Sequence, residues 1–139
     1  MLPLVLWTFV SMTGRDVLGE WASSIRMPKA TRAKLDQALD RLGQLPFEKA
    51  IHTHLLAPVA RERHIYKLRV NGHVAVRIML CRGPLRAEDA YTLLVGAVER
   101  DGRLDPPDAP RKAANRLEEV LRHPSERRKL YEGLGEGTA

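Results

Sequence analysis

The chain is poor in cysteine and in long apolar runs, and each shortage excludes a class of protein. Cys81 is the one cysteine among 139 residues, so no intrachain disulfide can form, and a reducing cytoplasm is the expected compartment. The apolar residues 1–10 lack the basic start and the cleavage site of a signal peptide. They are also fewer than the ~20 apolar residues that a membrane helix needs. We expect a buried strand there and no membrane partner.

Motifs for cofactors and metals are also missing. The sequence has no phosphate-binding glycine loop, zinc motif or nucleotide fingerprint, so neither a cofactor nor a metal is expected. His52 and His54 have the spacing of a metal-binding pair on a strand, but no third His, Cys or clustered carboxylate lies nearby. Cys81 has no accompanying His–Asp pattern, which indicates a packing role rather than a nucleophile.

The composition is that of an ordinary soluble globular protein. Hydrophobic residues make up 44% and charged residues 29%, which excludes a disordered or collagen-like chain. A domain of this length buries roughly two-thirds of its unfolded surface, which suffices for folding without disulfides. We predict a single domain over residues 1–139, with a frayed tail over residues 133–139.

Positive charge is concentrated in one part of the chain. The net charge is +6, and residues 61–82 contain six basic residues against the single acid Glu62. A basic surface confined to one element is typical of a protein that binds a polyanion, although a solvated basic surface has the same composition. The six basic residues are Arg61, Arg63, Lys67, Arg69, Arg77 and Arg82.

Helical periodicity appears in three segments. The first follows Thr13, whose spacing to Asp16 indicates an N-cap, and the second begins at Pro28 and ends at Gly43. Together they form a helical hairpin. The third follows Asp108 and ends before Pro124, and residues 125–131 could form one more short helix. The inward positions of the third helix are Ala113, Ala114, Leu117, Val120 and Leu121.

Period-two alternation predicts a basic hairpin. Over residues 63–70 apolar and basic side chains alternate, and residues 73–82 continue the pattern. Asn71-Gly72 between them predicts a type I′ turn, which needs positive φ at both positions. In this arrangement four cationic side chains share one face of the sheet. They are Lys67, Arg69, His73 and Arg77.

The remaining segments complete an α+β order. Residues 91–98 are almost continuously apolar, which predicts a central strand covered on both sides. Residues 46–60 show neither periodicity clearly. The predicted order is β-α-α-β-β-β-α, with a mostly antiparallel sheet of about four strands.

These segments resemble the RelE/ParE superfamily, and within it the HigB-like toxins, which include phage-derived members. The resemblance covers about residues 4–121 and is carried by three short stretches. They are residues 65–70 (IYKLRV), 76–80 (VRIML) and 91–97 (YTLLVGA). It implies a RelE-like fold and a cytoplasmic toxin of a type II toxin–antitoxin module. Such a toxin is a ribosome-dependent, metal-independent mRNA endonuclease that inhibits translation, and its partners are mRNA on the ribosome and a cognate antitoxin.

The resemblance also suggests which residues do the chemistry. Metal-free cleavage of RNA requires a base for the 2′-hydroxyl, stabilisation of a dianionic phosphorane and an acid for the leaving 5′-oxygen. The resemblance maps its phosphate-binding arginines to Arg69 and Arg77, whose planar guanidinium suits that task. The proton-transfer group is to be found among Lys67, His73, Tyr66, Tyr91 and Glu99, of which we favour the first two. Further RNA contacts are expected from Arg61, Arg63, Arg82 and Arg100.

One position departs from the toxin pattern. HigB-like chains continue after the last strand through an aromatic residue into a pair of lysines, whereas this chain has Glu99-Arg100 and no aromatic. A carboxylate there would repel a phosphate unless it acts as a base or turns away. The departure favours an alternative: a non-catalytic, phage-encoded protein of the same fold that binds a host machine such as gyrase or RNA polymerase.

Overall fold

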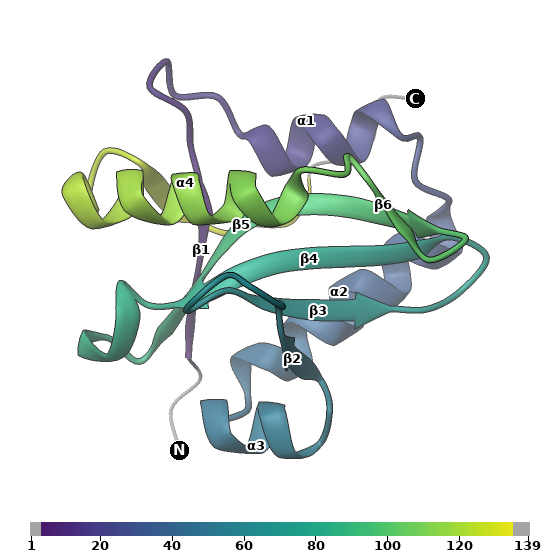
Figure 1. Cartoon of the computed structure of the whole chain (residues 1–139), viewed down its shortest axis with the longest axis horizontal. Coiled ribbons are helices and arrows are strands. Elements are labelled where there is room, and N and C mark those ends of the chain that lie inside the picture. Colours follow the sequence, from purple (N-terminus) through teal and green to yellow (C-terminus); the bar gives the residue numbers. More distant parts are fainter. Residues whose placement is uncertain (1–3, 135–139) are drawn as a thin grey trace.

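The sheet at the centre of the molecule follows the order β2-β3-β4-β5-β1-β7, with β6 paired to β5 (Figure 1). This computed structural model describes residues 4–134. The strands are β1 (Val5–Phe9), β2 (Leu56–Pro58), β3 (Tyr66–Val70), β4 (Ala75–Arg82), β5 (Ala90–Arg100), β6 (Arg103–Asp105) and β7 (Arg128–Leu130). The helices are α1 (Val17–Ser24), α2 (Lys29–Gly43), α3 (Phe47–His52) and α4 (Ala109–Arg122), with a 3₁₀ turn η1 (Leu85–Ala87).

The α+β class is as the sequence predicts, but the sheet has more strands. Seven strands are present among the described residues, and the three unexpected ones, β2, β6 and β7, have three residues each. Only β1 and β5 pair in parallel, and every other described pair is antiparallel. Residues 46–60, which showed no clear periodicity, form α3 and β2.

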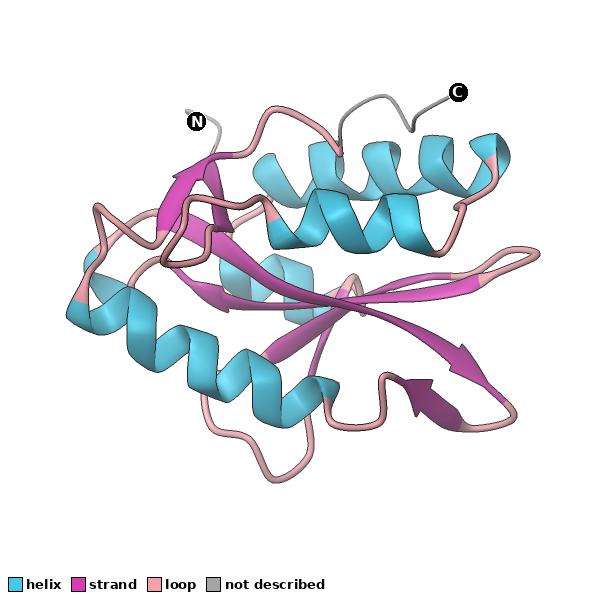
Figure 2. Ribbon diagram, turned by 90° about the horizontal axis from the view of Figure 1, so that it is seen from above, coloured by secondary structure: helices cyan, strands magenta, loops and turns pink. Residues whose placement is uncertain are grey.

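Helices cover both faces of the sheet. The hairpin of α1 and α2 lies on one side and α4 on the other (Figure 2). Leu68, Ile78 and Leu93 pack under the hairpin, while Met79 and Val95 pack under α4. The strand between them, β5, is buried from Ala90 to Val98, which confirms the prediction of a central strand covered on both sides.

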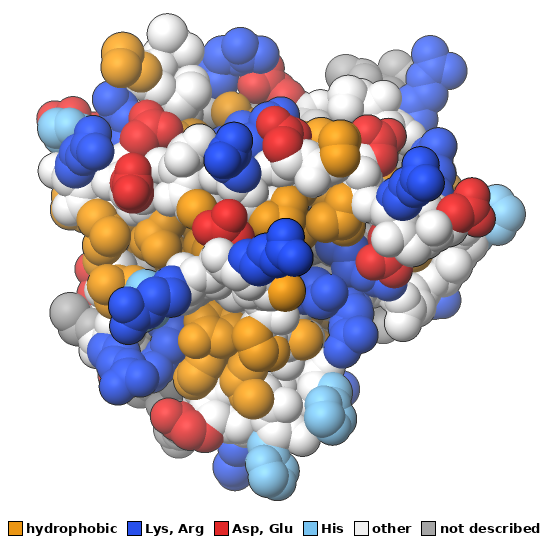
Figure 3. Space-filling view, viewed as in Figure 1, with side chains coloured by type: hydrophobic (Ala, Val, Ile, Leu, Met, Phe, Trp, Pro, Cys, Tyr) orange, Lys and Arg blue, Asp and Glu red, His pale blue; other side chains and the backbone are white. Residues whose placement is uncertain are grey.

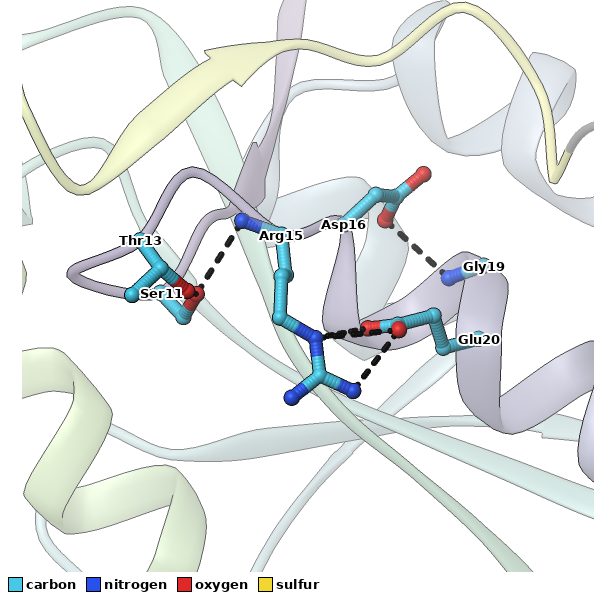
Figure 4. A network of polar contacts seen from close by, with 6 residues as sticks. All are labelled: Ser11, Thr13, Arg15, Asp16, Gly19 and Glu20. Atoms are coloured by element: carbon cyan, nitrogen blue, oxygen red, sulfur yellow. Dashed lines mark hydrogen bonds and ion pairs between the residues drawn. The ribbon is translucent and has the colours of Figure 1, made fainter.

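The start of α1 is fixed by polar contacts close in sequence (Figure 4). The N-cap is Asp16, whose side chain accepts a hydrogen bond from the Gly19 backbone N–H at 3.0 Å. The prediction of Thr13 as the cap was wrong, because its hydroxyl is bonded to Ser11 at 3.1 Å, outside the helix. Arg15 donates Nε and Nη2 to the Glu20 carboxylate, which ties the preceding loop to the first turn.

The prediction of a tight turn at Asn71-Gly72 was wrong. Neither residue has a positive φ, and residues 71–74 form a longer loop, so β4 begins at Ala75 and His73 is outside it. Side-chain contacts hold this loop: Asn71 accepts from the Arg77 guanidinium at 3.1 Å. The turn with two left-handed residues is Asp101-Gly102, with φ of 52° and 74°, and it joins β5 to β6.

The C-terminal segment also differs from the prediction. Arg128–Leu130 forms β7 beside β1 instead of a helix, because β1 has a free edge whose backbone groups it pairs. Leu121 is exposed on the outer side of α4 at 44%. Leu134, placed in the frayed tail by the sequence, is buried against the hairpin core. Residues 135–139 of that tail lie outside the described residues.

Candidate nucleic-acid interface

Three cationic side chains form a row across β3 and β4. Arg69 pairs with Arg77 across the two antiparallel strands, and Lys67 pairs with Met79. Directly opposed residues point to the same face of a sheet, and so do residues two apart along a strand. Lys67, Arg69 and Arg77 therefore share one face, as the alternation predicts. We call these three residues the cation row.

Arg77 is held by other protein groups rather than exposed to solvent. Its side chain is 7% exposed, and one terminal nitrogen lies 3.0 Å from Oε2 of Glu99 on β5. The other terminal nitrogen donates to the Asn71 side chain at 3.1 Å and to the Val76 carbonyl at 3.0 Å. Glu99 neutralises Arg77 and the sheet buries it, which leaves its guanidinium less available to a phosphate than the sequence predicts.

Glu99 has a clear structural role in the row. Two arginines directly opposite each other across strands repel. The Glu99 carboxylate, placed on the same face by the pairing of Glu99 with Ala75, offsets that repulsion. The departure from the toxin pattern at this position is therefore a partner for Arg77.

Lys67 and Arg69 remain available to a ligand. Lys67 is half-buried and Arg69 is exposed. Neither has a hydrogen-bond or ion-pair partner among residues 4–134. Two adjacent unpaired cations, with no carboxylate of their own, are suited to phosphate oxygens.

The other predicted site residues do not join this row. His73 is exposed in the loop before β4, so its predicted place on the strand face was wrong. Arg100 is exposed at the end of β5, and alternation directs it away from the face of Glu99. Arg61 and Arg63 are exposed in the loop between β2 and β3.

Arg82 belongs to a second group of residues on the hairpin side of the sheet. Its guanidinium lies 4.2 Å from the centroid of the Phe47 ring, and Phe47 packs edge-on against Tyr66 at 4.8 Å. A pocket of about 260 Å³ opens beside it. The pocket is lined by His64, Tyr66, Arg82, Leu85 and Arg86. We call it the Arg82 pocket.

Basic side chains gather in two places on the face shown in Figure 3. Blue side chains gather at the lower left of this face, where η1 and the loop before β3 lie, and others lie over β3 and β4. Hydrophobic side chains lie between the two groups. Sequence reasoning missed His64 and Arg86, because their neighbourhood depends on two loops meeting: His64 lies just before β3 and Arg86 lies in η1.

Of the two tyrosine candidates for proton transfer, Tyr91 is buried and Tyr66 is half-buried. The Tyr91 hydroxyl donates to the Leu45 carbonyl at 3.2 Å, and burial raises the pKa of Tyr91 to about 12. Burial likewise raises the pKa of the Cys81 thiol to about 12, which agrees with a packing role for it. Tyr66 is half-buried against Phe47.

The described residues provide no cluster of three or more His, Cys, Asp or Glu side chains that could hold a metal ion. His52 ends α3 and His54 follows in a left-handed conformation, so the two are not spaced along a strand. Within residues 4–134, every helix is too short or too polar to cross a membrane.

Comparisons with known proteins identify no relative of this chain. No family model, curated protein or solved structure matches this chain. The function is therefore argued from the cation row, the Arg82 pocket and the order of the elements.

Proposed function

We propose that this protein is a HigB/RelE-like toxin that binds and cleaves mRNA on the ribosome without a metal. A cognate antitoxin protein would neutralise it. The observation that carries the proposal is the adjacent pair Lys67 and Arg69, two cations without partners among the described residues on one face of β3. Such a pair fits the phosphate backbone of RNA, which supplies most of the affinity in nucleic-acid binding.

The order of elements supports a RelE-like topology. Without the short elements α3, β2, η1, β6 and β7, the chain runs β1, α1, α2, β3, β4, β5, α4. This is the order β-α-α-β-β-β-α that the sequence pattern predicts. The helical hairpin precedes the basic strands, and α4 follows the central strand β5 and packs on it.

In the proposed reaction Arg69, Lys67 and His73 each have their own task. Arg69 binds the scissile phosphate and stabilises the negative charge of the phosphorane. Lys67, two residues away on the same face, acts as a neutral amine and accepts the proton of the 2′-hydroxyl. His73, in the loop whose Asn71 contacts Arg77, is proposed to protonate the leaving 5′-oxygen. Arg77 takes no direct part, because Glu99 holds it.

The test is cleavage of mRNA by the purified full chain on translating ribosomes, mapped by primer extension. We expect cleavage by the wild type, and a loss of roughly a hundredfold or more for the double variant Lys67→Ala/Arg69→Ala. Lys29→Ala, which removes one exposed charge at the start of α2 on the opposite side of the sheet, serves as the control. Intact message at high protein concentration would contradict the proposal.

The Arg77–Glu99 ion pair favours a second candidate. Because it withdraws one arginine from the row, the fold could serve a non-catalytic protein that binds and inhibits gyrase or RNA polymerase. Affinity capture from a bacterial lysate separates the two. Recovery of a gyrase or polymerase subunit supports the second candidate, and recovery of ribosomes or a small antitoxin supports the first.

A further inference from the structure

The Arg82 pocket has the composition of an anion site. Two arginines and a histidine contribute to its wall, and no acidic side chain among the described residues lines it. At about 260 Å³ it lies just below the range of roughly 300–1,000 Å³ in which drug-sized ligands bind. It is therefore sized for one nucleotide unit rather than a larger molecule.

Arg82 is oriented without being neutralised. Its guanidinium is stacked on the Phe47 ring at 4.2 Å, and the ring itself is held edge-on by Tyr66 at an interplanar angle of 73°. Arg82 has no carboxylate ion pair among the described residues. An aromatic contact of this kind fixes the direction of the guanidinium and leaves its N–H groups free to donate to an anion.

The backbone around the pocket adopts conformations that side chains normally avoid. His64 has a φ of 67° and Leu85 a φ of 50°, both in the left-handed region. Arg61, in the same loop as His64, has a φ of 69°. Residues held in such conformations are concentrated at ligand-binding sites, because the surrounding structure must compensate for their strain.

Charge around the pocket sets the side from which a ligand approaches. The neighbouring cavity shares Arg82 but is lined by Glu48, Glu88 and Asp89, which would repel a polyanion. Arg61 and Arg63, in the same loop as His64, are exposed and add positive charge to the loop that lines the pocket.

We propose that the Arg82 pocket binds one nucleotide of single-stranded RNA, with Arg82 and Arg86 at its phosphate and Tyr66 and His64 beside its base. Single-stranded nucleic acids are recognised by this combination of aromatic and cationic side chains, since an unpaired base offers a free face and edge. The inference rests on the proposed function only in taking RNA as the ligand, because none of these residues belongs to the cation row.

The test is fluorescence anisotropy of a 5′-fluorescein-labelled U12 oligonucleotide with the full chain over a range of salt concentrations. Arg86→Ala, at an exposed position, is expected to weaken binding roughly tenfold. The plot of log affinity against log salt concentration should become shallower, its slope decreasing in magnitude by about 0.7, the value for one lost phosphate contact on a single strand. Arg82→Gln should do the same, and Lys29→Ala should leave both quantities near the wild-type values.

The outcomes separate this inference from the proposed function. If both pocket variants keep the wild-type affinity and slope, the Arg82 pocket does not bind RNA, even if Lys67→Ala/Arg69→Ala abolishes cleavage. If the pocket variants bind U12 more weakly but the wild-type protein leaves mRNA intact, nucleotide binding at the Arg82 pocket is supported and the proposed nuclease activity is contradicted. An equal loss of affinity for a 12-base-pair RNA duplex would overturn the assignment to single strands.

Discussion

Replacing Glu99 by glutamine tests whether the carboxylate both stabilises the sheet and restrains RNA binding. The change removes the charge that lies 3.0 Å from the Arg77 guanidinium but keeps an oxygen that can accept a hydrogen bond. Arg77 would then be a buried cation without a counterion, directly opposite Arg69. We expect a less stable protein that binds RNA more tightly.

The magnitude follows from the exposure of the two partners. Removing one member of a fully buried ion pair costs about 3–5 kcal/mol. Glu99 is 34% exposed, so water screens the pair, and glutamine keeps one acceptor. The expected loss in the free energy of unfolding is therefore about 1–2 kcal/mol. For a chain of this size it corresponds to a fall in Tm of roughly 4 to 8 °C.

Calorimetry and U12 anisotropy measure the two effects on the same sample. Loss of one negative charge beside the cation row is expected to tighten U12 binding several-fold. The slope of log affinity against log salt concentration should increase in magnitude by about 0.7. Glu20→Gln is the matched control, because it breaks an ion pair at the surface, far from the row, and should leave both Tm and affinity nearly unchanged. An unchanged Tm together with unchanged or weaker RNA binding in Glu99→Gln would refute the reasoning.

Three further predictions concern the fold. Burial raises the pKa of the Cys81 thiol to about 12 from 9.0, so the folded protein should resist alkylation by iodoacetamide at pH 8. Only the unfolded chain ionises this thiol between pH 9 and 12, so the free energy of unfolding in urea titrations should fall over that range. Gly96→Ala should lower the free energy of unfolding in urea by about 1–3 kcal/mol, since the added Cβ would overlap the Trp21 ring. Gly43→Ala, whose Cβ would make an ordinary contact, should be tolerated. Asp16→Ala should lower the stability by about 1 kcal/mol and Thr13→Ala should not, and the reverse ranking of their Tm values would contradict the assigned cap.

Side-chain periodicity was enough to find the elements that bury apolar residues. The alternation around Leu68 and Ile78 and the apolar run of β5 identified the central strands, because burial on a pleated surface leaves a period of two or a continuous run. The three-residue strands β2, β6 and β7 are too short to show a period. They form because longer neighbouring strands offer unpaired backbone groups, which a local pattern does not encode.

The site was predicted only in part, for a related reason. Alternation placed Lys67, Arg69 and Arg77 on one face correctly, since all three lie within one hairpin. The partner of Arg77 comes from β5, 22 positions later, and depends on the register between β4 and β5. The type I′ turn predicted at Asn71-Gly72 does not form, since neither residue has a positive φ, and the contact of the Asn71 side chain with Arg77 in this loop is not encoded in the local pattern.

The short outer strands have a consequence for how other macromolecules can approach. Within residues 4–134 the outermost strands, β2 and β7, have three residues each, and they include Pro58 on one side and Lys129 on the other. Proline cannot donate a ladder hydrogen bond, and the half-exposed Lys129 places a charged side chain at the other edge. Both features disfavour the addition of a further strand at these edges, which directs binding partners toward the faces and loops of the molecule.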